Sequence, residues 1–100
     1  MLYLFSYGTL QDGDIQKELF HRQLMGSPDL LLGFELSQNK VYGKYPVISK
    51  APGITSGISG MAYEISPREL VQVDAYEGEE YSRITVKLQT DKKAWVYIAK

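Results

Sequence analysis

The sequence has no cysteine and only one histidine, His21. The absence of cysteine excludes disulfides, thiolate zinc sites and cysteine nucleophiles. A single histidine cannot form a metal site that needs several imidazoles. Neither glycine-rich phosphate-binding pattern, G-x-x-x-x-G-K-[ST] or G-x-G-x-x-G, is present. These absences exclude thiolate and multi-histidine metal sites and both of these nucleotide-binding loops.

Neither sign of charge is in excess, and no long apolar run occurs. The chain has 11 basic and 12 acidic residues, for a formal net charge of −1. A nucleic-acid binder would show a basic excess gathered into patches, and a membrane span needs roughly 20 apolar residues. The apolar start at residues 1–5 lacks the basic stretch of a secretion signal. We therefore expect a cytoplasmic protein, a monomer or small homo-oligomer, with no nucleic-acid or membrane partner.

The composition is otherwise that of a folded globule, with 44% hydrophobic and 23% charged residues. One hundred residues predict a single domain covering 1–100. Tyrosine is unusually frequent, with eight against three phenylalanines and one tryptophan. Tyrosine suits a pocket that must be both apolar and hydrogen-bonding.

The first half of the chain predicts two strands around one helix. A short apolar and aromatic run at 2–7 indicates a buried strand that Gly8 ends. Capping residues at 12–14 and apolar residues at helical spacing predict a helix to about Met25, broken by Gly26-Ser27-Pro28. A second strand is expected at 30–36. Residues 37–56 are expected to be mostly loop, of the length that is usually functional or ordered by a ligand.

The second half predicts a capped helix among strands. Ser66-Pro67-Arg68-Glu69 matches the capping box S-x-x-E with proline at the first helical position. That helix should run to about Tyr76 or Glu77, with Gly78 as its stop. Strands are expected at 57–65, 81–89 and 94–99, the last two joined by a turn at 91–93. This order of elements predicts an α+β fold with a largely antiparallel sheet or small barrel.

Glu77 is the first candidate for chemistry. It shares one helical stripe with Leu70, Val73 and Asp74. The two apolar residues must face the core, so Glu77 would be carried inward, where desolvation raises the pKa of a carboxyl toward neutrality. Such a group suits a general base. The alternative is that the helix end frays and turns Glu77 outward beside the acidic residues that follow it.

The second candidate is the turn Tyr7-Gly8-Thr9-Leu10, where the first strand ends. A glycine there lets backbone N–H groups face outward without a Cβ in the way. Such a turn can hold a carboxylate or an oxyanion. The plainer alternative is a turn that only terminates a strand.

Taken together, these segments resemble a known family. Residues 4–10, LFSYGTL, and residues 73–83, VDAYEGEEYSR, are similar to the "YGTL" and "LDxxEGxxYxR" motifs of the γ-glutamylcyclotransferase-like family. This family includes the γ-glutamylamine cyclotransferases and the AIG2-like proteins. Residues 45–48, YPVI, resemble the family's middle block, so the resemblance runs from about residue 3 to residue 88.

The resemblance implies a fold, a reaction and a set of site residues. The fold would be a small mixed, mostly antiparallel β-barrel with flanking helices and a pocket at one end. The enzyme would cyclise a γ-glutamyl compound to 5-oxoproline and release an amine or amino acid, without a cofactor. Glu77 would be the acid/base, and Tyr7, Gly8, Thr9 and Leu10 would bind the substrate's glutamyl group. Since membership of the family does not by itself establish catalysis, an inactive small-molecule binding module on the same fold is the alternative.

The remaining candidates are tyrosines and charged residues. We expect Tyr81 to reach back toward the Tyr7–Gly8 turn and Tyr45 to belong to the rim of the pocket. The alternative for Tyr81 is an ordinary edge aromatic at the start of its strand. His21 is expected to be a surface or partly packed histidine and not a catalytic one. Asp74 is expected to cap the helix or to form a salt bridge with a residue such as Arg83, and the alternative is a carboxylate pair with Glu77.

Overall fold

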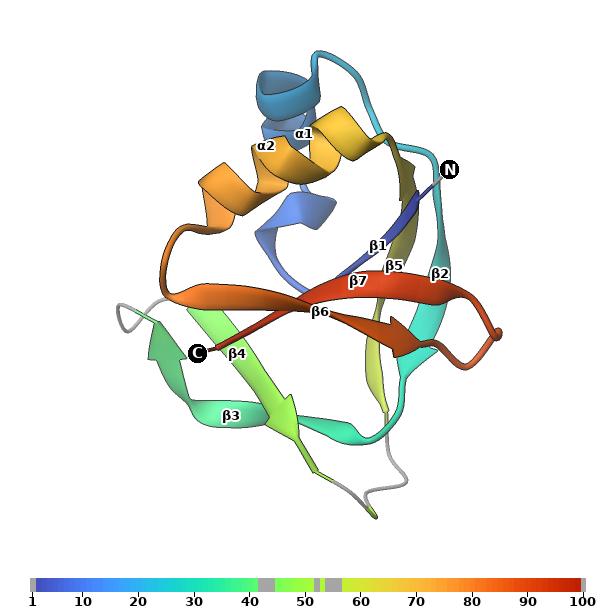
Figure 1. Cartoon of the computed structure of the whole chain (residues 1–100), viewed down its shortest axis with the longest axis vertical. Helices are drawn as coiled ribbons and strands as arrows, with labels where there is room; N and C mark the ends of the chain where they lie inside the picture. The colour runs from blue at the N-terminus through green and yellow to red at the C-terminus, as the bar shows by residue number, and fades with distance from the viewer. Residues whose placement is uncertain (1, 42–44, 52, 54–56, 100) are drawn as a thin grey trace.

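The computed structural model describes residues 2–41, 45–51, 53 and 57–99 (Figure 1). Two helices, one 3-10 turn and seven strands make up this part of the chain. The strands are β1 (Leu2–Ser6), β2 (Gly26–Leu31), β3 (Phe34–Val41), β4 (Tyr45–Lys50), β5 (Ile58–Ile65), β6 (Tyr81–Lys87) and β7 (Lys93–Ala99). The helices are α1 (Gly13–Phe20) and α2 (Pro67–Glu77), and the 3-10 turn is η1 (Thr9–Gln11).

Five of the strands form one mixed sheet in the order β2-β5-β1-β7-β6, and β3 pairs with β4 in a separate hairpin. The pairings in the sheet are antiparallel except that β1 runs parallel to β7, with Leu4 opposite Trp95. The predicted α+β class with a mostly antiparallel sheet is confirmed. The sheet does not close into a barrel, because β2 and β6 remain its two edges. We call the gap between these two edges the seam. A hydrogen bond of 2.9 Å from the Gln89 N–H to the Leu30 carbonyl bridges it.

Alternation along the central strands separates two apolar cores. Leu4 and Tyr97 belong to the cluster that packs under α1 and α2. Their neighbours Phe5 and Val96 belong to the cluster that the β3–β4 hairpin covers. Figure 1 shows the helices together above the sheet and the hairpin below it. In the part of the chain that is described, no helix is long and apolar enough to cross a membrane.

Helix α2 begins and ends as its sequence predicts. The Ser66 hydroxyl accepts from the Glu69 N–H, and the Glu69 carboxylate accepts from the Ser66 N–H at 2.8 Å, which completes the capping box. Arg22 donates two hydrogen bonds of 2.8 Å to the same carboxylate. The helix ends at Gly78, whose φ of +79° and ψ of −170° favour glycine.

The prediction of a longer first helix is wrong. Helix α1 ends at Phe20, because His21 takes a left-handed conformation (φ 58°) and its N–H bonds to the Lys17 carbonyl. The predicted break at residues 26–28 is instead the start of β2. Pro28 is tolerated there because β2 is an edge strand, where a missing N–H can face away from the sheet.

The predictions for residues 30–56 are also wrong in two places. The strand expected at 30–36 is interrupted at Gly33, whose φ of +83° turns the chain from β2 into β3. Much of the expected loop at 37–56 is the β3–β4 hairpin, in which Phe34 pairs with Lys50 and Leu36 with Ile48. Ile48 is 1% exposed, so its burial against the sheet outweighs the weak strand propensity of the polar residues in β3.

Candidate active site

Glu77 is the last residue of α2, and its side chain is half-buried, whereas Glu79 and Glu80 beyond the helix are exposed. Leu70 and Val73, on the same stripe, are in the core at 6% and 0% exposure. The inward alternative for Glu77 is therefore the one that the structure adopts. Burial raises the pKa of this carboxyl to about 7. A carboxylate with this pKa can both take and return a proton near neutral pH.

Tyr7 lies at the end of β1 and connects three strands. Its hydroxyl donates a 2.8 Å hydrogen bond to the Tyr97 carbonyl of β7, and the Ile48 backbone of β4 hydrogen-bonds to it. Burial, followed by the charges of Tyr81 and Glu77, raises the pKa of Tyr7 above its usual value. Tyr81 and Glu77 are thus near enough to the Tyr7 hydroxyl to affect its ionisation.

Asp74 ties the helix that carries Glu77 to the sheet. Its carboxylate accepts from the Tyr97 hydroxyl at 2.5 Å and from Arg83 at 2.8 and 3.1 Å. Burial opposes ionisation of Asp74, but these hydrogen bonds outweigh it and hold its pKa below the usual range. Arg83 also stacks on the Trp95 ring, 4.4 Å from the ring centroid. The expected salt bridge between Asp74 and Arg83 is confirmed.

The three residues that follow Tyr7 in the predicted substrate-binding turn, Gly8, Thr9 and Leu10, lie in three different environments. An ideal Cβ on Gly8 would meet no atom within 4 Å, so the space above its backbone is open. Thr9 is exposed, and its hydroxyl is 2.7 Å from that of Tyr76 on α2. Leu10 is 3% exposed and packs in the core under the helices. Its carbonyl accepts from the side-chain amide of Gln16.

The other predicted residues are placed as follows. Tyr81, the first residue of β6, is half-buried and packs against the core under the helices. Tyr45 begins β4 opposite Val41, and its side chain lies outside what the structure describes. His21 is exposed, as expected.

Tyr97 is the residue of this cluster that the sequence reasoning missed. It is 6% exposed. Its hydroxyl donates a hydrogen bond to Asp74, and its carbonyl accepts one from the Tyr7 hydroxyl. A signal was available, because extending the β6–β7 hairpin from its turn pairs Arg83 with Tyr97. Residues paired across an antiparallel ladder share a face, so Tyr97 could have been placed beside the Arg83–Asp74 pair.

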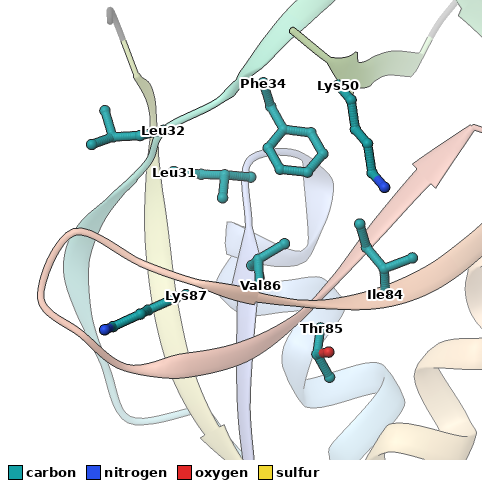
Figure 2. A pocket seen from close by; sticks show the side chains of 8 residues that line it. All are labelled: Leu31, Leu32, Phe34, Lys50, Ile84, Thr85, Val86 and Lys87. Carbon is teal, nitrogen blue, oxygen red and sulfur yellow. The ribbon is translucent and has the colours of Figure 1, made fainter. Parts of the chain in front are cut away.

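A cavity on the other face of β6 is separate from this cluster. Figure 2 shows Ile84 and Val86 pointing into it and Thr85 pointing away. The cavity is lined by none of the residues of the candidate site, which are Tyr7, Gly8, Thr9, Leu10, Asp74, Glu77, Tyr81, Arg83 and Tyr97. The candidate active site therefore consists of side chains gathered at the ends of β1 and α2 and the start of β6.

Comparison with known structures gives the same fold. The solution structure of At3g28950.1 from Arabidopsis thaliana is 23% identical, with a TM-score of 0.82, and the match covers 98% of this chain and 61% of that one. The solution structure of At5g39720.1 from the same plant is 26% identical, with a TM-score of 0.80 and coverage of 98% and 68%. The uncharacterized human protein loc79017 is 21% identical, with a TM-score of 0.73 and coverage of 99% and 66%. The chain thus spans about three fifths to two thirds of these proteins.

No curated protein matches the chain in sequence. A family model described as "Gamma-glutamyl cyclotransferase, AIG2-like" matches residues 4–100, which include the two motifs and every side chain of the candidate site. With nearly the whole chain matched and the fold shared, the protein belongs to the AIG2-like gamma-glutamyl cyclotransferase family.

Proposed function

We propose that this protein is a γ-glutamyl cyclotransferase that converts a γ-glutamyl compound into 5-oxoproline and a free amine or amino acid. The observation that carries the proposal is Glu77, a half-buried carboxyl at the end of α2 with a pKa of about 7, whose charge also acts on the Tyr7 hydroxyl. Membership of the family supports the class of reaction. The residue roles and the substrate are our inference.

In the proposed reaction Glu77 carries the proton. The ionised carboxylate takes a proton from the substrate's α-ammonium, and the resulting amine attacks the γ-carbonyl carbon of the same molecule. A five-membered ring closes with a tetrahedral oxyanion. When the bond to the leaving nitrogen breaks, protonated Glu77 returns the proton to that nitrogen. The ring nitrogen, which still carries two hydrogens after the attack, then passes its extra proton through Glu77 to the released amine, so that 5-oxoproline keeps one N–H and the amine leaves as an ammonium. Water is not consumed, and Glu77 ends in its starting state.

Because nucleophile and electrophile belong to one molecule, the protein's main task is to fold the substrate into the attacking conformation. The open backbone at Gly8 suits the approach of the substrate's carboxylate or of the oxyanion, which backbone N–H groups can stabilise. Tyr7 and Tyr81 provide apolar walls with hydroxyls for the methylene chain between the charged ends. Tyr45 is proposed to complete the rim.

The direct test is to incubate the pure protein with a panel of γ-glutamyl dipeptides and γ-glutamylamines and to assay 5-oxoproline. We expect product from at least one member of the panel and a loss of at least a hundredfold in kcat for Glu77→Gln, in line with loss of a general base. Glu80→Gln, which removes an exposed carboxylate three residues away, is the matched control and should keep wild-type activity. Equal turnover by Glu77→Gln and wild type would eliminate Glu77 as the base.

Thermal shift on the same panel separates turnover from binding alone. Stabilisation by γ-glutamyl compounds or 5-oxoproline with no product formed would instead favour a binding module on this fold. Product formation would remove that alternative.

A further inference from the structure

The cavity in Figure 2 has an apolar lining that the proposed reaction does not use. Leu31 at the end of β2 and Phe34 at the start of β3 are 1% and 8% exposed, and both point into it. Ile84 and Val86 of β6, each half-buried, face them from the other side. The cavity has a volume of about 560 Å³, within the range of small-molecule sites.

A lysine lies on the apolar face that covers this cavity. Lys50 pairs with Phe34, and Ile48 is two residues away on the same strand. Side chains of paired residues and of residues two apart share a face of a hairpin, so Lys50 belongs to the face that carries buried Phe34 and Ile48. Figure 2 shows its chain reaching from β4 toward Ile84, over the cavity.

The position of the cavity explains why it is open. It lies along the seam where the five-stranded sheet does not close, between the edge strand β6 and the segment that joins β2 to β3. The backbone bond from Gln89 to Leu30 spans the seam beyond the end of β6. This cavity, called the groove from here on, therefore has apolar walls on both sides of the seam and one cation, Lys50, at its opening.

We propose that this groove binds a free medium-chain carboxylate, such as octanoate. Its alkyl chain lies against Leu31, Phe34 and Val86, and its carboxylate meets the Lys50 ammonium. The site is separate from Glu77, so binding there does not depend on the cyclotransferase activity.

The charges around the groove favour a monoanion. The other lysine of the lining, Lys87, points away from the cavity in Figure 2 and pairs with Asp91 at 3.4 Å. Lys50 is thus the cation that faces the groove among the lining residues. One carboxylate neutralises it, whereas a phosphate dianion would leave a second negative charge without a partner among the lining residues. An ammonium headgroup would be repelled by Lys50.

The test is a titration of the methyl-labelled protein with sodium octanoate, followed by NMR. We expect saturable shifts of the Leu31, Ile84 and Val86 methyl groups, with a Kd on the order of 1 mM. 1-Octanol has the same alkyl chain without the charge. It should bind about three- to fivefold more weakly, because a surface ion pair usually contributes about that much to affinity. Octylammonium should bind more weakly still.

Matched variants identify the cation and separate this site from Glu77. Lys50→Gln should weaken octanoate binding to the level of 1-octanol and leave 1-octanol unchanged, whereas Lys87→Gln and Glu77→Gln should bind octanoate like wild type. The proposal is overturned if octanoate does not saturate, if 1-octanol binds equally well, or if Lys50→Gln has no effect. Shifts of these methyl groups with protein concentration alone, accompanied by dimerisation in sedimentation experiments, would assign the groove to a second copy and also overturn it.

Discussion

At the scale of single residues, burial of Glu77 has opposite effects on chemistry and on stability. The pKa of Glu77 rises from its ordinary 4.5 to about 7 in the fold, so between these values the folded protein binds more protons than the unfolded chain. Stability must then fall as the pH rises through this window and stay level above it. The ionised form of Glu77, which the proposed reaction needs, is thus the form that destabilises the fold.

Glu77→Gln should therefore stabilise the protein at high pH. We expect the free energy of unfolding at pH 8 to rise by about 1–2 kcal/mol, less than the full linkage value because the side chain is partly exposed. Near pH 4 the carboxyl is protonated in both states, and the variant and wild type should differ by less than about 0.5 kcal/mol. Urea unfolding at the two pH values measures this. An equal difference at both would mean that Glu77 titrates normally.

Gly8→Ala tests whether a ligand approaches the backbone of the turn. The residue has a φ of −133° and a ψ of −142°, and an added Cβ meets no atom within 4 Å, so the stability of the fold should change by less than about 1 kcal/mol. If the substrate packs there, kcat/KM should fall at least about tenfold. Gly78→Ala is the contrasting variant, since its φ of +79° should make it lose about 1–3 kcal/mol of stability. Unchanged kinetics in Gly8→Ala would place the substrate elsewhere.

At the scale of elements, the sequence predicted best the elements whose signals are local. Helix α2 carries its own capping box, and the β6–β7 hairpin its own alternation and turn. Helix α1 was predicted too long because nothing in the residues after Phe20 marks the left-handed turn at His21. The β3–β4 hairpin was missed because its strand character comes from packing of Ile48 against a sheet that is formed by distant residues.

The same distinction applies to the candidate site. Helical spacing made Glu77 a candidate but left its direction open, and the motif resemblance favoured the inward one. Tyr7 and Tyr81 were candidates from the motifs. Tyr97 needed the register of two strands, and the open space at Gly8 needed the full structure. The cavity beside β6, and its separation from the candidate site, could not be predicted from the sequence, since both depend on a sheet that stays open.

Asp74→Asn tests the link between α2 and the sheet. An amide cannot keep the ion pair with Arg83 or accept from Tyr97 as a charged group, so we expect a loss of about 1 kcal/mol at pH 7, discounted for partial exposure. Because the pKa of Asp74 is lowered in the fold, its contribution is present above the unfolded pKa of about 3.8 and is lost in stronger acid. Denaturant unfolding at pH 7 and below about pH 3 should show the penalty shrinking in acid. A penalty independent of pH would mean that the charge of Asp74 contributes nothing.

At the scale of the whole molecule, the open seam depends on a small polar cluster. Asp29 is 8% exposed, and it accepts from the Thr90 hydroxyl at 2.5 Å and from the Leu30 N–H at 2.8 Å. This carboxylate joins the edge strand β2 to the turn that follows β6. The two edges of the sheet are thereby held at a fixed separation.

Asp29→Ala should lower the stability of the molecule without altering the candidate active site. We expect a loss of about 2 kcal/mol, because two donors lose a buried acceptor, and an unchanged kcat/KM well below the melting temperature. Thr90→Ser keeps the hydroxyl and is the control, with a smaller expected loss. A fall in kcat/KM of the folded Asp29→Ala variant would show that the seam and the active site are coupled.

The parallel pairing of β1 with β7 also has a consequence for synthesis. Leu4 emerges from the ribosome long before Trp95, its neighbour in the sheet, and translation at roughly 5–20 residues per second makes that interval on the order of 5–20 seconds. During this time one edge of the central strand has no partner, and the carbonyl that will receive the Tyr7 hydroxyl does not yet exist. The nascent chain must therefore spend seconds with an apolar strand edge exposed, a state that chaperones bind and that invites aggregation.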